Sequence, residues 1–176
     1  MADLPEKPRV FLDANILLAG NAFPRWPYEV LEHATDGDFH VILSPLVIEQ
    51  APEHLQKRFP EHVSRFERFI QETEYELAPN PSLEEIEAST TLIRDLSDVA
   101  IALAAINAKA NYLVSEDKDF TVQDETTVEL HRRMKVMLSG TFLREVMGWT
   151  SEELEAIRHR KWSDMPEETT ASPERE

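Results

Sequence analysis

Four acidic residues occupy comparable positions in the sequence, each beside an apolar stretch. Asp13 directly follows an apolar, β-prone run, and Asp117 comes shortly after another. Glu49 and Asp98 fall in the early turns of two helical patterns. In open parallel α/β sheets, ligands gather beyond the carboxyl ends of the strands. We therefore expect Asp13, Glu49, Asp98 and Asp117 to face one edge of a sheet.

Carboxylates that converge must be compensated. Two unit charges about 4 Å apart repel by roughly 4 kcal/mol at an effective dielectric near 20, and a whole domain is stable by only about 5–15 kcal/mol. Either the acids stay apart, or some are protonated, or a cation lies among them. All-oxygen ligands select hard divalent ions such as Mg²⁺ or Mn²⁺, which activate water and neutralise charge on a phosphodiester.

Each acid also has a simpler interpretation. Asp13 or Asn15 could cap the next helix, and Glu49 could be a solvated helix residue. Asp98 could serve only as favourable charge at a helix N-terminus, and Asp117 could belong to a turn. The single positions are therefore weak signals, and their arrangement in the fold decides between these interpretations.

The elements that must position these acids alternate along the chain. Apolar or alternating runs predict strands at residues 10–13, 39–43, 112–114 and 133–138, with an extended or irregular passage at 75–81. Helical patterns lie between them. This alternation predicts a three-layer α/β/α sandwich with a mostly parallel central sheet.

Polar residues mark where the helices begin. Ser44 precedes a proline in the pattern of an N-cap, and a capping box opens a helix predicted over 82–93. Ser97 is expected to cap the helix 98–106, which is apolar almost all round and must be buried. A further serine-capped helix is expected over 139–146.

The composition limits the class of protein. The chain has 176 residues and no cysteine, which excludes disulfides and thiolate-bound zinc and makes a reducing, cytoplasmic location the simplest expectation. No apolar stretch reaches membrane-spanning length. We expect one domain at residues 1–148, a helical extension at 149–163 and a disordered acidic tail at 164–176.

The formal net charge of −16 argues against a nucleic-acid partner if it is taken alone. The excess acids, however, belong mostly to helix faces and to the tail, so docking cations remain possible. Lys118, Arg132, Arg133 and Lys135 are candidate phosphate contacts, although exposed basic side chains are commonly just solvated. No interleaving of aromatic and basic residues suggests a sequence-reading RNA platform.

The motifs in their order resemble a known family. Val10-Phe11-Leu12-Asp13-Ala14-Asn15 and Ser44-Pro45-Leu46-Val47-Ile48-Glu49 resemble the first two motifs of PIN-domain ribonucleases. Asp95-Leu96-Ser97-Asp98-Val99-Ala100 is similar to the third motif, and Val114-Ser115-Glu116-Asp117-Lys118-Asp119-Phe120 to the fourth. The resemblance runs from Arg9 to about Met147.

The resemblance implies a metal-dependent endoribonuclease that hydrolyses RNA by metal-activated water and leaves 5′-phosphate and 3′-hydroxyl ends. By motif, Asp13, Glu49, Asp98 and Asp117 would be the catalytic acids and the ligands of Mg²⁺ or Mn²⁺. Four further residues would support them: Asn15 and Ser115 by orienting a carboxylate, a water or a phosphate oxygen, and Asp95 and Asp119 as additional ligands or as acids behind the ligands. Ser115 replaces a threonine that is common in the family and keeps the hydroxyl.

Many members of the family are toxins of the VapC type. For such a toxin the resemblance implies a homodimer and an antitoxin protein that enters the acidic pocket. The extension beyond about Thr150 departs from the compact toxin pattern. Two alternatives remain: a non-catalytic PIN-like binding or scaffold module, and an aspartyl-phosphate enzyme, whose pattern requires a second Asp where Asn15 stands.

Overall fold

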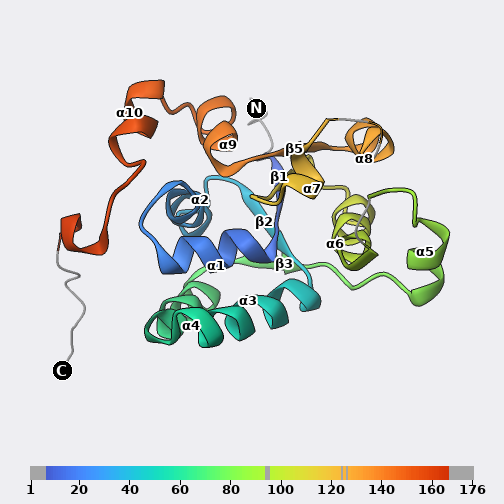
Figure 1. Cartoon of the computed structure of the whole chain (residues 1–176), viewed down its shortest axis with the longest axis horizontal. Helices are drawn as coiled ribbons and strands as arrows, with labels where there is room; N and C mark the ends of the chain where they lie inside the picture. Colours follow the sequence, from blue (N-terminus) through green and yellow to red (C-terminus); the bar gives the residue numbers. More distant parts are fainter. Residues whose placement is uncertain (1–6, 94–95, 124, 126, 167–176) are drawn as a thin grey trace, which may run out of the picture.

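A five-stranded, fully parallel sheet forms the centre of the molecule (Figure 1). The computed structural model describes residues 7–93, 96–123, 125 and 127–166. Its strands are β1 (Arg9–Leu12), β2 (His40–Leu43), β3 (Tyr75–Leu77), β4 (Tyr112–Val114) and β5 (Lys135–Met137). Their order across the sheet is β3-β2-β1-β4-β5. The predicted α/β class with a parallel sheet is confirmed.

The helices of the described residues flank this sheet on both sides. They are α1 (Ala14–Ala22), α2 (Trp26–Thr35), α3 (Pro45–Arg58), α4 (Val63–Glu72), α5 (Leu83–Ala88), α6 (Leu96–Asn107), α7 (Lys118–Thr121), α8 (Val128–Arg133), α9 (Ser139–Glu145) and α10 (Ser151–Ala156), with 3-10 turns η1 (Pro60–His62) and η2 (Trp162–Asp164). Helices α1 to α4 and α9 gather on one side, and α5 and α6 lie on the other (Figure 1).

The central strands form because their residues are apolar on both faces. Val10, Phe11 and Leu12 of β1 are completely buried, as are Leu113 and Val114 of β4. A strand covered by helices on both faces reads as a continuous apolar run. Strand β1 therefore lies in the middle of the sheet, between β2 and β4.

The two edge strands are the least well predicted. The passage 75–81 was expected to be extended or irregular, and its first three residues pair with β2 as strand β3. The strand expected over 133–138 is shortened to β5, because Arg133 ends the unpredicted helix α8. Both strands have three residues, of which two are partly buried and one is exposed, so their sequences carry little apolar periodicity.

Several helix boundaries also differ from expectation. Ser44 caps α3 as predicted, with its Oγ accepting a hydrogen bond from the Val47 N–H. Helix α5 ends at Ala88 rather than continuing through 93, because a Ser-Thr-Thr run follows and these residues favour caps and turns over helix interiors. Helix α6 begins at Leu96, ahead of the expected cap Ser97.

The C-terminal segment packs back onto the sheet-flanking helices. Helix α10 begins with the capping box of Thr150 and Glu153, and its Leu154 is buried. The Leu154 carbonyl accepts a hydrogen bond from Trp26 Nε1 of α2, at 2.8 Å. The Arg160 guanidinium forms an ion pair with Glu29 of α2 at 2.6 Å. No helix in the described part of the chain is long and apolar enough to cross a membrane.

Candidate active site

The strand order creates a crevice at one position of the sheet. From β1 the chain proceeds outward through β2 and β3, and after crossing over it continues through β4 and β5 on the other side. In open α/β sheets such a reversal point, beyond the carboxyl ends of the strands, is where ligands bind. Leu12 pairs with Val114 across the reversal point, so Asp13 and Ser115 follow the two strands side by side.

Asp13 is buried at the junction of β1 and α1. Its side chain caps α1, because Oδ1 accepts a hydrogen bond from the Ala14 N–H at 2.7 Å. Its Oδ2 accepts hydrogen bonds from Ser115 Oγ at 2.8 Å and from Asn15 Nδ2 at 3.2 Å. The capping interpretation of Asp13 is therefore confirmed, and its role as a metal ligand remains a prediction.

Its buried environment makes the Asp13 carboxyl group a weaker acid than an exposed aspartate. The pKa of Asp13 is raised from 3.8 to about 6, and the largest cause is burial. The hydrogen bonds from Ser115 and from the Ala14 N–H offset part of this rise, and the charge of Asp117 adds to it. Loss of hydration is thus the dominant effect. The negative charge of Asp117 acts in the same direction as burial and is the smallest of these effects.

A compact hydrogen-bond network joins the ends of β1 and β4. Asn15 Nδ2 also donates to Ser115 Oγ at 3.2 Å, and Asn15 Oδ1 accepts from the Glu116 N–H at 3.1 Å. Ser115 Oγ accepts in addition from the Asp117 N–H at 3.0 Å. The hydroxyl of Ser115 therefore fixes Asp13 and the loop that carries Asp117 relative to each other.

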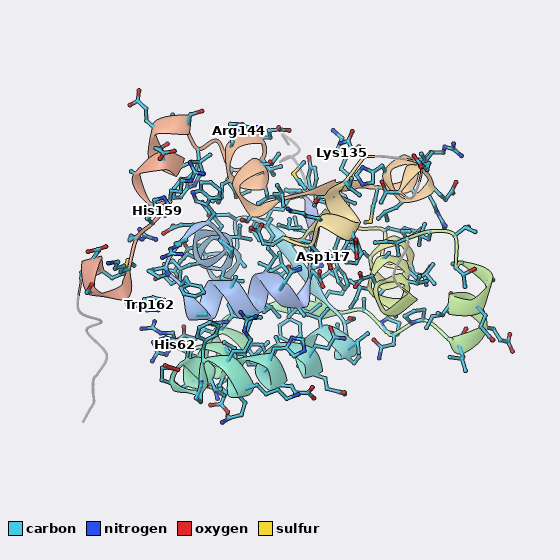
Figure 2. The ribbon with its side chains drawn as sticks, viewed as in Figure 1. His62, Asp117, Lys135, Arg144, His159 and Trp162 are labelled. Carbon is cyan, nitrogen blue, oxygen red and sulfur yellow. The ribbon has the colours of Figure 1, made fainter. Side chains whose placement is uncertain are left out.

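Three carboxylates lie together next to this network. Asp98, Asp117 and Asp119 each place a carboxylate oxygen within 4.8 Å of the others, and all three are partly buried. Asp117 caps α7, and its Oδ1 accepts a hydrogen bond from the Asp119 N–H at 2.8 Å. Asp98 comes from the first turn of α6. Asp117 lies among helices α1, α6 and α7 (Figure 2).

The structure gathers some predicted site residues and leaves others apart. Asp13, Asn15 and Ser115 form the network, and Asp119 joins Asp98 and Asp117 as a full member of the carboxylate group. Glu49 is exposed on α3 and does not belong to that group. Its role as a ligand remains a prediction. Asp95 lies outside the described residues.

The four candidate RNA contacts are all exposed but lie at different distances from the crevice. Lys118 is the first residue of α7, next to Asp117. Lys135 pairs with Tyr112, at the amino ends of β5 and β4, so it lies at the opposite edge of the sheet. Arg132 and Arg133 end the helix that leads into β5, and Arg132 pairs with Glu129 at 3.2 Å.

Two supporting contacts were not anticipated from the sequence. The Glu116 carboxylate accepts a hydrogen bond from the Ser139 N–H at 2.8 Å, at the first turn of α9. His131 Nε2 contacts the Phe120 carbonyl at 2.8 Å. Both contacts hold the loop after β4.

The cap of α9 differs from the prediction. Ser139 was expected to cap α9, but Leu138 is the cap residue, and the buried Ser139 Oγ has no hydrogen-bond partner in the described part.

The donor set fits a hard divalent cation. The three clustered side chains offer only carboxylate oxygens, which is the ligand chemistry of Mg²⁺ and Mn²⁺. They are partly buried, so their mutual repulsion is screened less than it would be at an open surface. A cation would offset this repulsion and also favour the ionised form of Asp13.

The fold and the acids define an α/β protein with a carboxylate site at the reversal point of its sheet. The family model described as PIN domain matches residues 9–119. The chain belongs to the PIN-domain family, whose members are generally nucleases. The match includes β1, β4 and every residue of the carboxylate group. No curated protein matches the chain.

Two solved structures show the same fold at low sequence identity. PAE2754 from Pyrobaculum aerophilum is 17% identical with a TM-score of 0.55, over 81% of this chain and 91% of that one. VapBC2 from Rickettsia felis, whose structure was determined bound to a DNA fragment from its promoter, includes a chain that is 20% identical with a TM-score of 0.51. That similarity covers 73% of this chain and 97% of that one.

Proposed function

We propose that this protein is an endoribonuclease that depends on Mg²⁺ or Mn²⁺ and acts at the carboxylate site. The observation that carries the proposal is the group of Asp98, Asp117 and Asp119, whose oxygens lie within 4.8 Å of one another at the reversal point of a PIN-domain sheet. These three side chains would hold the cation. A divalent cation at such a place supplies charge neutralisation for a phosphodiester and a lowered pKa for water.

The remaining residues of the site have positioning tasks. Ser115 and Asn15 keep the Asp13 carboxyl group oriented through its Oδ2, and ionised Asp13 would add negative charge beside the cation. Lys118, next to Asp117 at the start of α7, would contact a phosphate of the substrate. Glu116 holds the loop against α9, because its carboxylate accepts the Ser139 N–H. Hydrolysis would leave 5′-phosphate and 3′-hydroxyl ends.

We further propose that a partner protein controls this activity. The structural similarity to a chain of VapBC2 supports a toxin-like component, as does the acidic site itself, which a basic segment of an antitoxin could occupy. A homodimer and a cytoplasmic location are part of the same proposal. The extension at 149–163, packed against α2 through Trp26 and Arg160, would be an addition to the toxin-like core.

Cleavage of a 5′-labelled, unstructured RNA tests the proposed activity. We expect cleavage with Mn²⁺ or Mg²⁺ and none with EDTA, and we expect the new 3′ ends to be hydroxyls that a poly(A) polymerase can extend. The extension reaction distinguishes this chemistry from metal-independent ribonucleases, which leave 3′-phosphates or cyclic phosphates. Equal cleavage with and without EDTA would contradict the proposal.

A further inference from the structure

Four arginines of the described residues lie over aromatic rings, and all four pairs are at one end of the molecule. Their guanidinium-to-ring distances are 5.0 Å for Arg25 over Phe23, 5.4 Å for Arg58 over Phe59, 3.7 Å for Arg65 over Trp162 and 5.7 Å for Arg160 over Tyr28. Significant pairs of this kind occur roughly once per 70–80 residues. Together these four pairs form what we call the arginine–aromatic surface.

The rings also contact one another across segments that are distant in sequence. Phe23 follows α1 and Phe59 follows α3, and their rings meet edge to face at 5.2 Å. Tyr28 of α2 meets Trp162 of η2 in the same manner at 5.4 Å. His62 lies 5.7 Å from Trp162. The fold thus brings aromatic and basic side chains from segments distant in sequence, near residues 23–28, 58–65 and 160–162, onto one surface.

Part of this surface is open and positively charged. Phe23 is 38% exposed, and Arg58 is exposed. Neither Arg25 nor Arg58 forms an ion pair with a carboxylate in the described part of the chain; the Nε of Arg25 donates to the Arg160 carbonyl at 3.1 Å. A hollow of about 430 Å³ is lined in part by Tyr28, Arg65 and Trp162 of this surface, and also by Glu32 and Glu72.

The arginine–aromatic surface lies away from the carboxylates. Asp13 precedes α1 and Phe23 follows it, and a helix of nine residues spans about 14 Å at a rise of 1.5 Å per residue. Figure 2 shows His62 and Trp162 at one end of the molecule and Asp117 well separated from them. A ligand that touches both places must therefore be extended.

We propose that the arginine–aromatic surface is a second docking site for single-stranded RNA. The proposal rests on the proposed function, in which RNA is the substrate. In a chain of net charge −16, a polyanion needs a local cluster of cations to dock. Unpaired bases stack on aromatic rings and guanidinium planes while arginines contact the phosphates. An exposed Phe23 beside two arginines without carboxylate partners offers both interactions.

An acidic protein segment would use the arginines but not the stacking surfaces. The proposal therefore predicts two properties that a purely electrostatic site lacks. Affinity should depend on guanidinium planes and not on charge alone, and RNA should compete better than a peptide of the same charge. Since single-stranded sites span about 4–16 nucleotides, only the longer RNAs should reach both the surface and the carboxylates.

Fluorescence anisotropy of a labelled, unstructured RNA of about 16 nucleotides in EDTA tests this proposal on the full chain. We expect the double variant Arg25→Ala/Arg58→Ala to raise the dissociation constant at least about tenfold, since one stacked base contributes about 1–3 kcal/mol and about 1.4 kcal/mol is tenfold. Arg58→Lys should weaken binding despite its retained charge. The control Lys109→Ala/Arg144→Ala removes the same charge from exposed positions elsewhere and should change affinity less than twofold.

Equal affinities for the double variant and the control would overturn the proposal, and so would a poly-glutamate peptide that competes as well as RNA. If thermal melting shows that the double variant is unfolded, the single variant Arg58→Ala, at an exposed position, replaces it in the binding measurement. We then expect its affinity for RNA to fall by about threefold. Cleavage is measured separately with metal. A wild-type protein that binds RNA through these arginines but does not cut it would overturn the proposed function and still support the docking site.

Discussion

Asp117→Asn is expected to lower metal-dependent RNA cleavage by about 10²- to 10³-fold while the fold stays intact. Asp117 contributes to the carboxylate group and caps α7, and asparagine can still accept the cap hydrogen bond from the Asp119 N–H. The lost charge weakens the hold on the cation. A metal ion supplies several kcal/mol of transition-state stabilisation, and about 1.4 kcal/mol corresponds to tenfold in rate. Initial rates at saturating Mn²⁺ measure the effect.

Asp98→Asn should have a similar effect, since Asp98 belongs to the same group. The matched control is Asp36→Asn, which removes one exposed carboxylate after α2 and should leave the rate within about twofold, as surface substitutions away from special features do. Wild-type rates in both Asp117→Asn and Asp98→Asn would show that the chemistry occurs elsewhere.

A second large effect concerns stability and pH in the metal-free protein. Burial raises the pKa of Asp13 to about 6, from an ordinary value of 3.8. Between these values the folded state binds the proton more tightly than the unfolded state, so the free energy of unfolding falls as the pH rises from about 4 to above 6. At about 1.4 kcal/mol per pKa unit, the loss approaches about 3 kcal/mol. Urea unfolding in EDTA across this range measures it.

Comparison with Asp13→Asn isolates the contribution of this group, because the variant has no proton to lose. We expect the stability of wild type minus that of the variant to decrease through the window between pH 4 and 6 and to level off above it. Parallel stability curves for the two proteins would contradict a raised pKa. Ser115→Ala should extend the window upward, since the Ser115 hydroxyl donates to Asp13 Oδ2 and lowers its pKa.

The central part of the fold could be predicted because its residues are apolar on both faces. β1 and β4 are continuous apolar runs that end in polar residues, and the parallel topology then brings Asp13 next to Ser115 and Asp117. The edge strands could not be predicted with equal success. β3 and β5 have only three residues each and are partly solvated, so their pairing depends on neighbours that the local sequence does not reveal.

Which acids belong to the carboxylate group could also not be predicted from the sequence alone. The sequence left open whether Asp119 is an additional ligand or a supporting acid; the short helix α7 begins after Asp117 and brings the Asp119 carboxylate next to that of Asp117. Glu49, whose role as a ligand remains a prediction, lies exposed on a helix that follows β2, the strand on the other side of β1 from β4. The sequence places an acid near a strand end, whereas the strand order decides how close two such ends are.

The arginine–aromatic surface illustrates the same limit. Phe23, Phe59 and Trp162 are far apart in sequence, and no local pattern predicts that the three rings gather. Their proximity follows from the packing of α1, α2 and α3 together with the return of the C-terminal segment, in which Trp162 Nε1 donates to the Ala22 carbonyl at 2.8 Å. A function that depends on such a surface can be inferred only from the three-dimensional structure.

The most direct test of the carboxylate site is the melting temperature as a function of Mn²⁺ concentration. A ligand at 100 times its dissociation constant stabilises the folded state by about 2.7 kcal/mol, and for a chain of this size each kcal/mol raises the melting temperature by about 2–4 °C. We predict a rise of about 5–11 °C for the wild-type protein and for Asp36→Asn, with little or no rise for Asp117→Asn. Equal shifts in all three proteins, or no shift in any of them, would contradict a cation site built from Asp98, Asp117 and Asp119.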